Sequence, residues 1–317
     1  MLKGEHRGHE SNTLAGFCDS RHLTNQGTFH FELRVLEGSR DIVVDPRNER
    51  VKLYGLTPSD FKKKPVLADL LTPTESPREY SKVIVYAHPG DDEEWREASF
   101  HKEGMIRGFF SNHVNADIWA YYLNPERATE GGVDDHEQIV ESILCGQKTD
   151  ILPALPGGYT TMVANPVNAS EIVSVLGEVF SEYPTPLKVP VIENSIRSGA
   201  SHFRLVRDSA GRLVSVAAAE LDRVRKTAEI SDCATAPSNR GKSLMTFLLS
   251  QLERDVLGKY GIEDLYSLVR SGEPAINKAF RKRGFEYFGR LINNCRMPRG
   301  WESMNIWCKP CGPAFGV

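Results

Sequence analysis

The segment ATAPSNRGKSLMTFLL, residues 234–249, carries the residues whose types and spacing most clearly suggest chemistry. Its centre, RGKS at 240–243, precedes apolar residues at helical spacing, among them Leu244, Phe247 and Leu248. The first N–H groups of a helix have no partner within the helix, and the helix dipole places partial positive charge beside them. The sequence therefore predicts that this helix start binds a phosphate or pyrophosphate group.

Two different phosphate loops would fit this segment, and they imply different chemistry. The nucleotide-binding P-loop, G-x-x-x-x-G-K-[ST], ends in Gly-Lys-Ser, as the segment does at 241–243. Its first glycine would fall at Ala236, however, and the following Pro237 has no N–H to donate to a phosphate. The second possibility is a pyrophosphate loop in which an acidic strand, a short turn and Arg-Gly-Lys lead into a helix. The surrounding sequence favours this second loop.

The elements that must position this loop can be read from the patterns around it. A strand is predicted at 227–235, directly before the turn, and the helix after the loop ends at Gly261. Further elements are predicted as a helix beginning near Asn168, a hairpin at 201–221, strands at 263–270, 285–294 and 302–309, and a helix at 272–284. This order of helices and strands predicts an α/β layered domain.

A Pro/Gly-rich connector at 146–159 predicts two domains, 1–150 and 160–317. The segment 99–110 matches 279–290 at three positions, and in each half a short helix and an apolar strand precede it. The three matched pairs are Phe100/Phe280, Lys102/Lys282 and Gly104/Gly284. We expect a duplicated fold whose N-terminal copy is degenerate, because it has no equivalent of the 240–245 loop.

Composition excludes several classes of protein. The 317 residues carry 39 Lys and Arg against 42 Asp and Glu, a net charge of −3, which gives no broad basis for binding nucleic acid. No apolar run reaches membrane-spanning length, and the polar start lacks a secretory signal, so we expect a cytoplasmic protein that binds no membrane. Cys308-x-x-Cys311 is a single CxxC and favours reduced thiols; no metal site is predicted.

With the second loop preferred, AEISDCATAPSNRGKSLMTFLL resembles the core of the GCN5-related N-acetyltransferase (GNAT) family. The family loop is [QR]-x-x-G-x-[GA]; with Arg240 first, Ser243 and Met245 replace its two small residues. Segments in both halves, including EGMIRGFF, RGFEYFGRLINN and ESMNIWCK, also resemble the narrower group of β-lysine N-acetyltransferases. The resemblance implies the acyl-CoA N-acyltransferase fold, acetyl-CoA as cosubstrate, and direct transfer to the ε-amine of β-lysine, which makes a compatible solute.

The resemblance also implies roles for individual residues. Glu229 would be the general base, although an exposed strand glutamate in a salt bridge is nearly as plausible. Asp232 would bind a substrate ammonium if a β-bulge turns it inward; a surface aspartate fits equally well. Phe280 stands where many members have a tyrosine acid, so it cannot donate a proton and would pack on the cofactor or in the core. The cofactor contacts would be Cys233, Ala234, Thr235, Arg240, Gly241, Lys242, Ser243, Leu244, Asn277 and Phe280.

Two of these contacts have simpler interpretations: Lys242 as a solvated helix-start lysine, and Asn277 as a helix cap or a solvent-facing side chain. Three alternative functions also stay open at this point. They are acetylation of another small amine such as lysine or a polyamine, a non-catalytic acyl-CoA-binding regulator, and a P-loop nucleotidase. A homodimer is possible, but a duplicated fold can act as its own dimer, so the sequence does not fix the oligomeric state.

Overall fold

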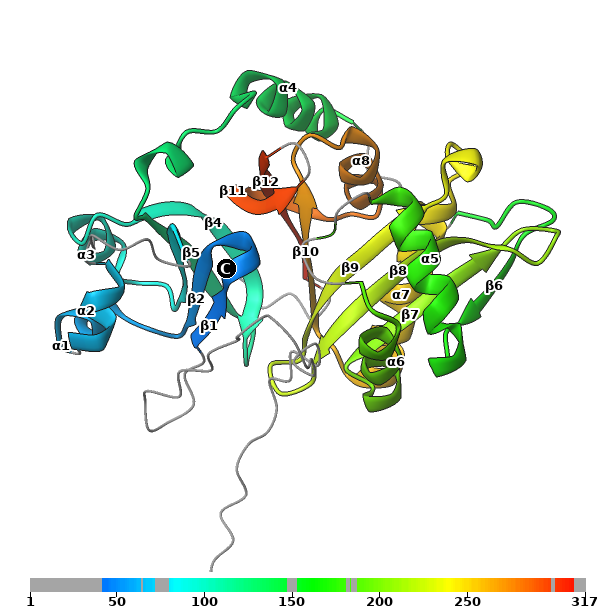
Figure 1. Cartoon of the computed structure of the whole chain (residues 1–317), viewed down its shortest axis with the longest axis horizontal. Helices are drawn as coiled ribbons and strands as arrows, with labels where there is room; N and C mark the ends of the chain where they lie inside the picture. The colour runs from blue at the N-terminus through cyan, green and yellow to red at the C-terminus, as the bar shows by residue number, and fades with distance from the viewer. Residues whose placement is uncertain are drawn as a thin grey trace, which may run out of the picture.

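The computed structural model describes residues 42–63, 65–71, 80–146, 153–180, 183, 187–297 and 300–310. Two halves stand side by side, the N-terminal half on the left of Figure 1 and the C-terminal half at the centre and right. The strands of the N-terminal half are β1 (Ile42–Asp45), β2 (Arg50–Tyr54), β3 (Lys82–Ala87), β4 (His101–Phe110) and β5 (Val114–Tyr122). Those of the C-terminal half are β6 (Thr160–Val163), β7 (Ser201–Arg207), β8 (Leu213–Asp222), β9 (Thr227–Thr235), β10 (Asp264–Arg270), β11 (Glu286–Met297) and β12 (Gly300–Pro310).

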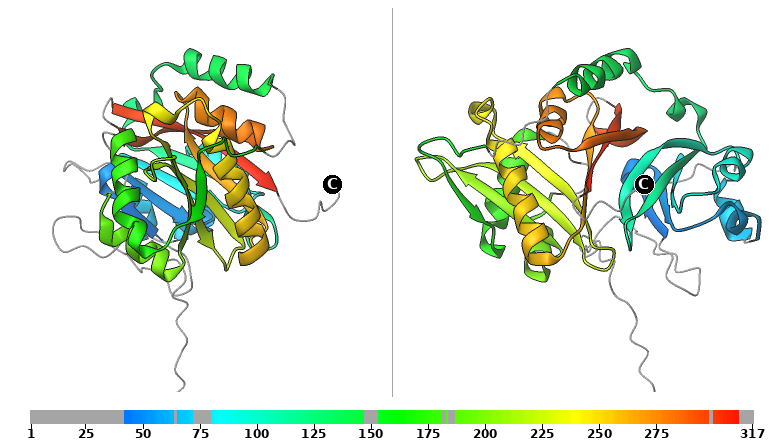
Figure 2. Two further views of the ribbon diagram at one scale, coloured as in Figure 1. Left: turned by 90° about the vertical axis from the view of Figure 1, so that its right-hand side faces the viewer. Right: turned by 180° about the vertical axis from the view of Figure 1, so that it is seen from behind.

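The helices form where the sequence places apolar residues along one helical face. In the N-terminal half they are α1 (Pro58–Lys63), α2 (Pro65–Leu71), α3 (Asp92–Glu97) and α4 (Val133–Leu144). In the C-terminal half they are α5 (Ala169–Val179), α6 (Val189–Ser198), α7 (Leu244–Tyr260) and α8 (Pro274–Lys282). Seen from behind, α7 crosses the opposite face of the sheet from α5 and α6 (Figure 2). The sheet of the C-terminal half is therefore a middle layer with helices on both faces, as the α/β prediction requires.

All the described strands form one sheet in the order β1-β2-β3-β5-β4-β11-β12-β10-β9-β8-β7-β6. Only β2–β3 and β9–β10 are parallel among these neighbouring pairs. Each half contains the same unit. A strand is followed by a helix and an antiparallel pair of strands, and the first strand of the unit lies parallel to the strand that precedes it in the chain. In the N-terminal half this unit is β3-α3-β4-β5 beside β2, and in the C-terminal half it is β10-α8-β11-β12 beside β9. The repeated connectivity supports the predicted duplication, but the duplication stays a prediction. The domain boundary at the connector also stays a prediction.

The predicted pairing of residues between the two copies is wrong. Phe100 lies just before β4, whereas Phe280 lies inside α8. Gly104 lies within β4, whereas Gly284 lies in the turn after α8. The identities therefore do not fall on equivalent elements; they are a coincidence of short, similar stretches.

The two halves join where β4 meets β11, and the joint depends on two glycines. Gly104 and Gly289 are Cα partners across this junction, with φ of 153° and 127°. A Cβ on Gly104 would lie 2.5 Å from the carbonyl oxygen of Phe288, and one on Gly289 would lie 2.4 Å from that of Glu103. Only glycine permits this approach, because real Cβ atoms do not come so close to backbone oxygens.

Buried charges cross the same junction. The Lys82 ammonium lies 2.7 and 2.8 Å from the two carboxylate oxygens of Glu103 and donates to the carbonyl oxygen of Ile292 at 2.6 Å. Burial lowers the pKa of Lys82 to about 8, although the Glu103 carboxylate opposes this shift. Both side chains are almost fully buried, so each needs the other to compensate its lost hydration.

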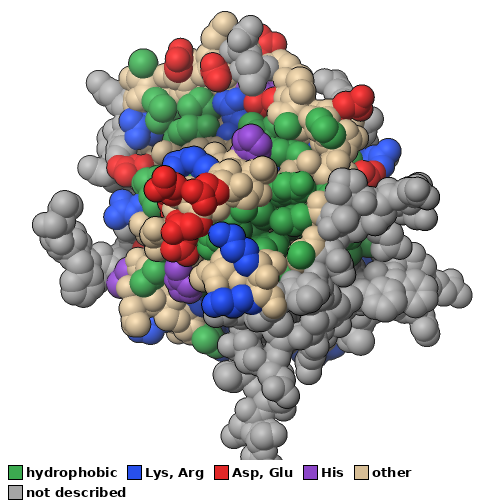
Figure 3. Space-filling view, turned by 90° about the vertical axis from the view of Figure 1, so that its left-hand side faces the viewer, with side chains coloured by type: hydrophobic (Ala, Val, Ile, Leu, Met, Phe, Trp, Pro, Cys, Tyr) green, Lys and Arg blue, Asp and Glu red, His purple; other side chains and the backbone are tan. Residues whose placement is uncertain are grey.

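The outer end of the N-terminal half faces the viewer in Figure 3, where acidic side chains lie close to basic ones around an apolar area. In the part of the chain that the structure describes, no helix is long and apolar enough to span a membrane. No group of three or more His, Cys, Asp or Glu side chains that could hold a metal ion occurs among the same residues. Cys308 is a buried free thiol, and Cys311 lies outside the described residues.

We predict that Gly104→Ala destabilises the protein by about 3 kcal/mol, since the added methyl overpacks the β4–β11 junction. Thermal unfolding followed by circular dichroism would measure the loss. Gly258→Ala on α7 is the matched control, because a Cβ there meets nothing within 4 Å and alanine favours a helix. Equal melting temperatures for the wild type and Gly104→Ala would contradict the role given to the glycine pair.

A second prediction concerns Asp255 on α7, which accepts hydrogen bonds from Arg204 Nε at 2.6 Å and lies 2.8 Å from His202 Nε2. Burial raises the pKa of Asp255, but the hydrogen bonds and charges of Arg204 and His202 outweigh it and lower the pKa to about 2. The carboxylate therefore stabilises the fold above its unfolded pKa of 3.8, and this contribution is lost as the pH falls toward 2.

We expect Asp255→Asn to lower the free energy of unfolding by about 2 kcal/mol at pH 7 and by much less near pH 2. Urea unfolding at several pH values would test this. Glu178→Gln, which changes an exposed carboxylate on α5, is the control and should have no effect. A difference between Asp255→Asn and wild type that does not shrink on acidification would disprove the linkage.

Candidate functional site

The central feature of the site is the separation of two parallel strands. β9 and β10 pair over only three positions, the last of which joins Glu229 to Tyr266. Both strands continue beyond this point, to Thr235 and Arg270, without further ladder pairs. Beyond the ladder, the Ser267 hydroxyl of β10 still donates to the carbonyl oxygen of Ile230 in β9 at 2.7 Å, and past this contact the strands separate. Such an opening in a sheet can accept an extended chain as if it were a further strand.

A β-bulge lies in β9 beyond the last ladder pair. Ser231 pairs with Ala218 of β8 and Ala234 with Val216, so Asp232 and Cys233 together oppose one residue. Asp232 has the left-handed φ of 49° that a bulge can impose. Its carboxylate is hydrogen bonded by the Tyr183 hydroxyl. The bulge that the sequence required for an inward Asp232 is thus present, and it takes one residue of β9 out of the ladder.

Glu229 is half-buried and lies at the end of the three-residue ladder. The Tyr266 hydroxyl donates to its Oε2 at 3.1 Å. Across the antiparallel side, Glu229 is the Cα partner of Glu220, whose Oε1 accepts from the Ser231 hydroxyl at 3.2 Å. Burial and the Glu229 carboxylate raise the pKa of Tyr266 well above its usual value, so the phenol stays protonated as a donor. Two carboxylates and a neutral phenol therefore converge where the strands part.

Aromatic side chains of the N-terminal half face this carboxylate. Tyr54 stacks on Tyr86 with ring centroids 4.7 Å apart, and Tyr86 stacks on Phe109 at 5.1 Å. Phe109 in turn meets Tyr266 edge-on at 5.8 Å. Burial raises the pKa of Tyr54 and Tyr86, and the nearby Glu229 charge adds to both shifts. The site is therefore built from both halves of the chain.

The predicted phosphate loop is open to solvent. Arg240, Gly241, Lys242 and Ser243 are exposed, whereas Leu244, the first residue of α7, is buried. Gly241 and Ser243 have left-handed φ values of 77° and 59°, which curl the loop before the helix. The N–H groups of the first turn of α7 have no intrahelical partner. These groups can bind a pyrophosphate, and Lys242 adds a positive charge beside them.

Three residues that raised a question about the loop have clear positions. The Met245 side chain packs against the hydrophobic core that α7 shares with the sheet, so it does not fill the loop. The Lys242 ammonium lies 2.7 Å from the Tyr159 hydroxyl and is exposed. Pro237 begins a short 3₁₀ helix, Pro237–Asn239, where a P-loop would need N–H groups directed at phosphate.

Two predicted cofactor contacts must be corrected. Asn277 is 0% exposed, and its amide donates to the carbonyl oxygens of Arg270 and Glu273 at 2.9 and 2.8 Å. Its Oδ1 accepts from Asn305 and Trp307, so all of its hydrogen-bonding capacity is used inside the protein. Phe280 is 1% exposed and packs edge-on against Phe285 at 5.0 Å. Asn277 and Phe280 hold the core together and offer no surface to a ligand; the alternative interpretation of Phe280 as a core residue holds.

The backbone contacts predicted at Cys233, Ala234 and Thr235 lie on the splayed part of β9. The Ala234 side chain is buried, so only its backbone could serve a ligand. Burial, with a further contribution from the Asp232 charge, raises the pKa of the half-buried Cys233 thiol well above its usual value. This shift disfavours the thiolate of Cys233, which is the nucleophilic form.

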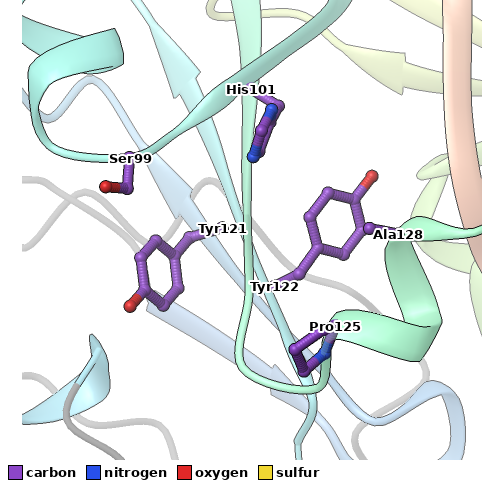
Figure 4. Close-up of a pocket in the computed structure, with 6 residues that line it drawn as sticks. All are labelled: Ser99, His101, Tyr121, Tyr122, Pro125 and Ala128. Atoms are coloured by element: carbon purple, nitrogen blue, oxygen red, sulfur yellow. The ribbon is translucent and has the colours of Figure 1, made fainter.

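Two cavities lie away from this site. The smaller one, of about 280 Å³, lies in the N-terminal half and is drawn in Figure 4 with its lining residues Ser99, His101, Tyr121, Tyr122, Pro125 and Ala128. The larger one, of about 740 Å³, lies between α4, β4 and β11 and includes Glu103, Glu137 and Arg290 in its lining. Neither is lined by Glu229 or by the phosphate loop, so neither is the candidate active site.

Some residues of the site were not predicted from the sequence. Tyr54, Tyr86 and Tyr266 were missed because each occupies an ordinary strand position, where a tyrosine gives no functional signal. The one usable signal was the position of Tyr266 in a strand directly after the loop helix, since the strand parallel to β9 must lie beside Glu229.

Comparison with known proteins gives this geometry its context. Residues 170–285 match the model of the acetyltransferase (GNAT) family. The chain is 32% identical over 249 residues to β-lysine N(6)-acetyltransferase of Methanosarcina mazei. This match covers 72% of this chain and 90% of that protein. It is also 32% identical to N-acetyltransferase YodP of Bacillus subtilis, over 72% of this chain and 82% of that one.

Among solved structures, spermidine N-acetyltransferase from Vibrio cholerae in complex with CoA and spermine aligns with a TM-score of 0.42 and 15% identity, covering 49% of this chain and 97% of that one. The ribosomal-protein-S18-alanine N-acetyltransferase from Escherichia coli aligns with a TM-score of 0.42 and 17% identity, over 49% of this chain and 96% of that one.

Proposed function

Because the chain belongs to the acetyltransferase (GNAT) family and is an acetyl-CoA-dependent N-acetyltransferase, we propose that its acceptor is the ε-amine of β-lysine. Two relatives named for this activity support the acceptor, one of them at 32% identity over 90% of its length. The observation that carries the proposal is the position of Glu229, a half-buried carboxylate where β9 and β10 separate. A carboxylate there can meet an amine and a thioester that enters through the opening.

The base is the first part of the proposed mechanism. A lysine-type ammonium has a pKa near ~10.4, so it must lose a proton before its nitrogen can attack a thioester. Glu229 accepts this proton through a water molecule, while the hydrogen bond from Tyr266 fixes its carboxylate. The acceptor and acetyl-CoA bind together, and the acetyl group passes directly between them without an acetylated residue.

The thioester is the second part. Acetyl-CoA lies with its pyrophosphate at residues 240–244 and its pantetheine arm along the splayed part of β9, near Cys233, Ala234 and Thr235. A backbone N–H released by the bulge at Asp232 donates to the thioester oxygen as negative charge develops there. As the new N–C bond forms and the C–S bond breaks, the nitrogen releases its second proton, which reaches the departing thiolate through water, since Phe280 has no proton to give.

The acceptor is tested by a thiol-release assay with acetyl-CoA against β-lysine, α-lysine and spermidine. We expect β-lysine to give the highest kcat/KM. A clear preference for α-lysine or spermidine would show that the acceptor is another small amine. Absence of thiol release with any amine, despite binding of acetyl-CoA in calorimetry, would contradict the catalytic assignment of Glu229.

In the same assay Glu229→Gln should lower kcat about 100-fold at neutral pH, because the variant cannot take the proton. The loss should shrink toward pH 10, where the free amine forms by itself. Glu220→Gln is the matched control, since it removes the same charge from the paired position on β8. An equal loss of kcat in both variants at every pH would show that charge, and not proton transfer, is what Glu229 supplies.

The phosphate loop gives a separate prediction. Lys242→Ala should raise the KM for acetyl-CoA about tenfold, because the variant loses one hydrogen bond to a charged group. It should leave the KM for S-acetylpantetheine unchanged, since this fragment lacks the pyrophosphate. Lys259→Ala, near the far end of α7, serves as the control and should change neither value. Equal effects of Lys242→Ala on both thioesters would place the pyrophosphate elsewhere.

A further inference from the structure

Arg225, in the turn between β8 and β9, extends across the boundary between the two halves. Its guanidinium carbon lies 5.7 Å from the ring centroid of Tyr54, 5.2 Å from that of Phe109 and 5.8 Å from that of Phe110. All three rings belong to β2 and β4 of the N-terminal half, toward which this turn points in Figure 1. A cation of the C-terminal half is therefore placed on the aromatic surface that faces Glu229.

The turn holds Arg225 in a defined position. Asp222 Oδ1 accepts the backbone N–H of Arg225 at 2.9 Å, and its Oδ2 lies 3.2 Å from the guanidinium. The carbonyl oxygen of Val224 accepts from the Ser111 hydroxyl of the N-terminal half at 3.4 Å. These bonds fix the turn to both halves, so the guanidinium is positioned before any ligand arrives.

A continuous path of contacts links Arg225 to the proposed base. Arg225 lies on Tyr54, Tyr54 stacks on Tyr86, and Phe109 connects this pair to Tyr266, which donates to Glu229. Along the chain, Arg225 precedes Glu229 by only four residues, about 13 Å at most. Arg225 lies on the opposite side of Glu229 from the Asp232 bulge, so an acceptor that extends away from the thioester runs toward it.

A second arginine near the same rings is already committed to the fold. Arg50 is 6% exposed, and its Nε donates to Asp45 at 2.9 Å. Its NH1 donates to the carbonyl oxygen of Asn294 at 3.1 Å, in the C-terminal half. The Arg225 side chain is paired with Asp222 of its own turn and is 18% exposed, so its guanidinium is the more accessible of the two.

We propose that Arg225 binds the carboxylate of an amino-acid acceptor whose distal amine lies at Glu229. This inference rests on the proposed N-acetyltransferase function and names the group that selects a diamino acid over a diamine without a carboxylate. A guanidinium can bind a carboxylate through two parallel N–H···O bonds, and a neighbouring aromatic surface strengthens this pair by excluding water. The N-terminal half thereby contributes to acceptor specificity, because its rings hold the guanidinium in place.

The test compares β-lysine with its carboxamide, which keeps the shape and both amines but lacks the negative charge. The wild type should acetylate β-lysine with a kcat/KM at least about tenfold higher than that of the carboxamide, mainly through KM. Arg225→Gln should abolish this preference, because it lowers the kcat/KM for β-lysine and leaves the kcat/KM for the carboxamide unchanged. Arg225→Lys should retain part of the preference, since it keeps the charge but not the fork of donors.

Arg223→Gln is the matched control. Arg223 lies in the same turn, but its guanidinium lies over Tyr260 at 5.2 Å, away from the site, so both substrates should behave as with the wild type. An equal loss on both substrates in Arg225→Gln would show a purely structural role and overturn the inference. A wild type that acetylates both substrates equally would also overturn it while leaving acetyl transfer intact. If the wild type acetylates neither substrate, the proposed acceptor itself is wrong.

Discussion

The contact between Gly104 and Gly289 is the constraint on which the rest of this structure depends. Neither position tolerates a Cβ, because the facing carbonyl oxygens lie where the methyl would be. Their close approach lets β4 pair with β11. The five strands of the N-terminal half and the seven strands of the C-terminal half therefore form one sheet. The face of this joined sheet that carries Tyr86, Phe109 and Ile306 encloses a core formed by both halves. Glu229 lies at the edge of that core, opposite tyrosines from the other half.

Buried charged side chains, and not apolar contacts alone, stabilise the junction between β4 and β11. Lys82 and Glu103 are joined to the backbone of Ile292, and Arg127 donates to the carbonyl oxygens of Asn48, Glu49 and Asn293. Such groups are costly to desolvate, so they tolerate only the arrangement in which every partner is present. An apolar junction would permit sliding of one half on the other. The ionic one fixes the distance between the tyrosines of β2 and β3 and the carboxylate of β9.

The two halves repeat one topology but end their parallel ladders differently. The ladder of β2 and β3 ends in Tyr54 and Tyr86, whereas the ladder of β9 and β10 ends in Glu229 and Tyr266. Among the described residues, only β9 is followed by an Arg-Gly-Lys loop and a long helix. This difference supports a division of labour in which the C-terminal half binds acetyl-CoA and transfers the acetyl group. In this proposal the N-terminal half supplies one wall of the acceptor site.

The sequence by itself determined the features that depend on neighbours along the chain: the helix start after Arg240, the strand carrying Glu229, and most elements of the C-terminal half. Local hydrogen bonding and apolar periodicity are sufficient for these. Only the tertiary structure decided which side chains meet. It placed Asn277 in the core and brought Tyr54 and Arg225 to the site. Such contacts depend on the glycine junction and on the twist of a sheet built from distant segments, and no local pattern records them.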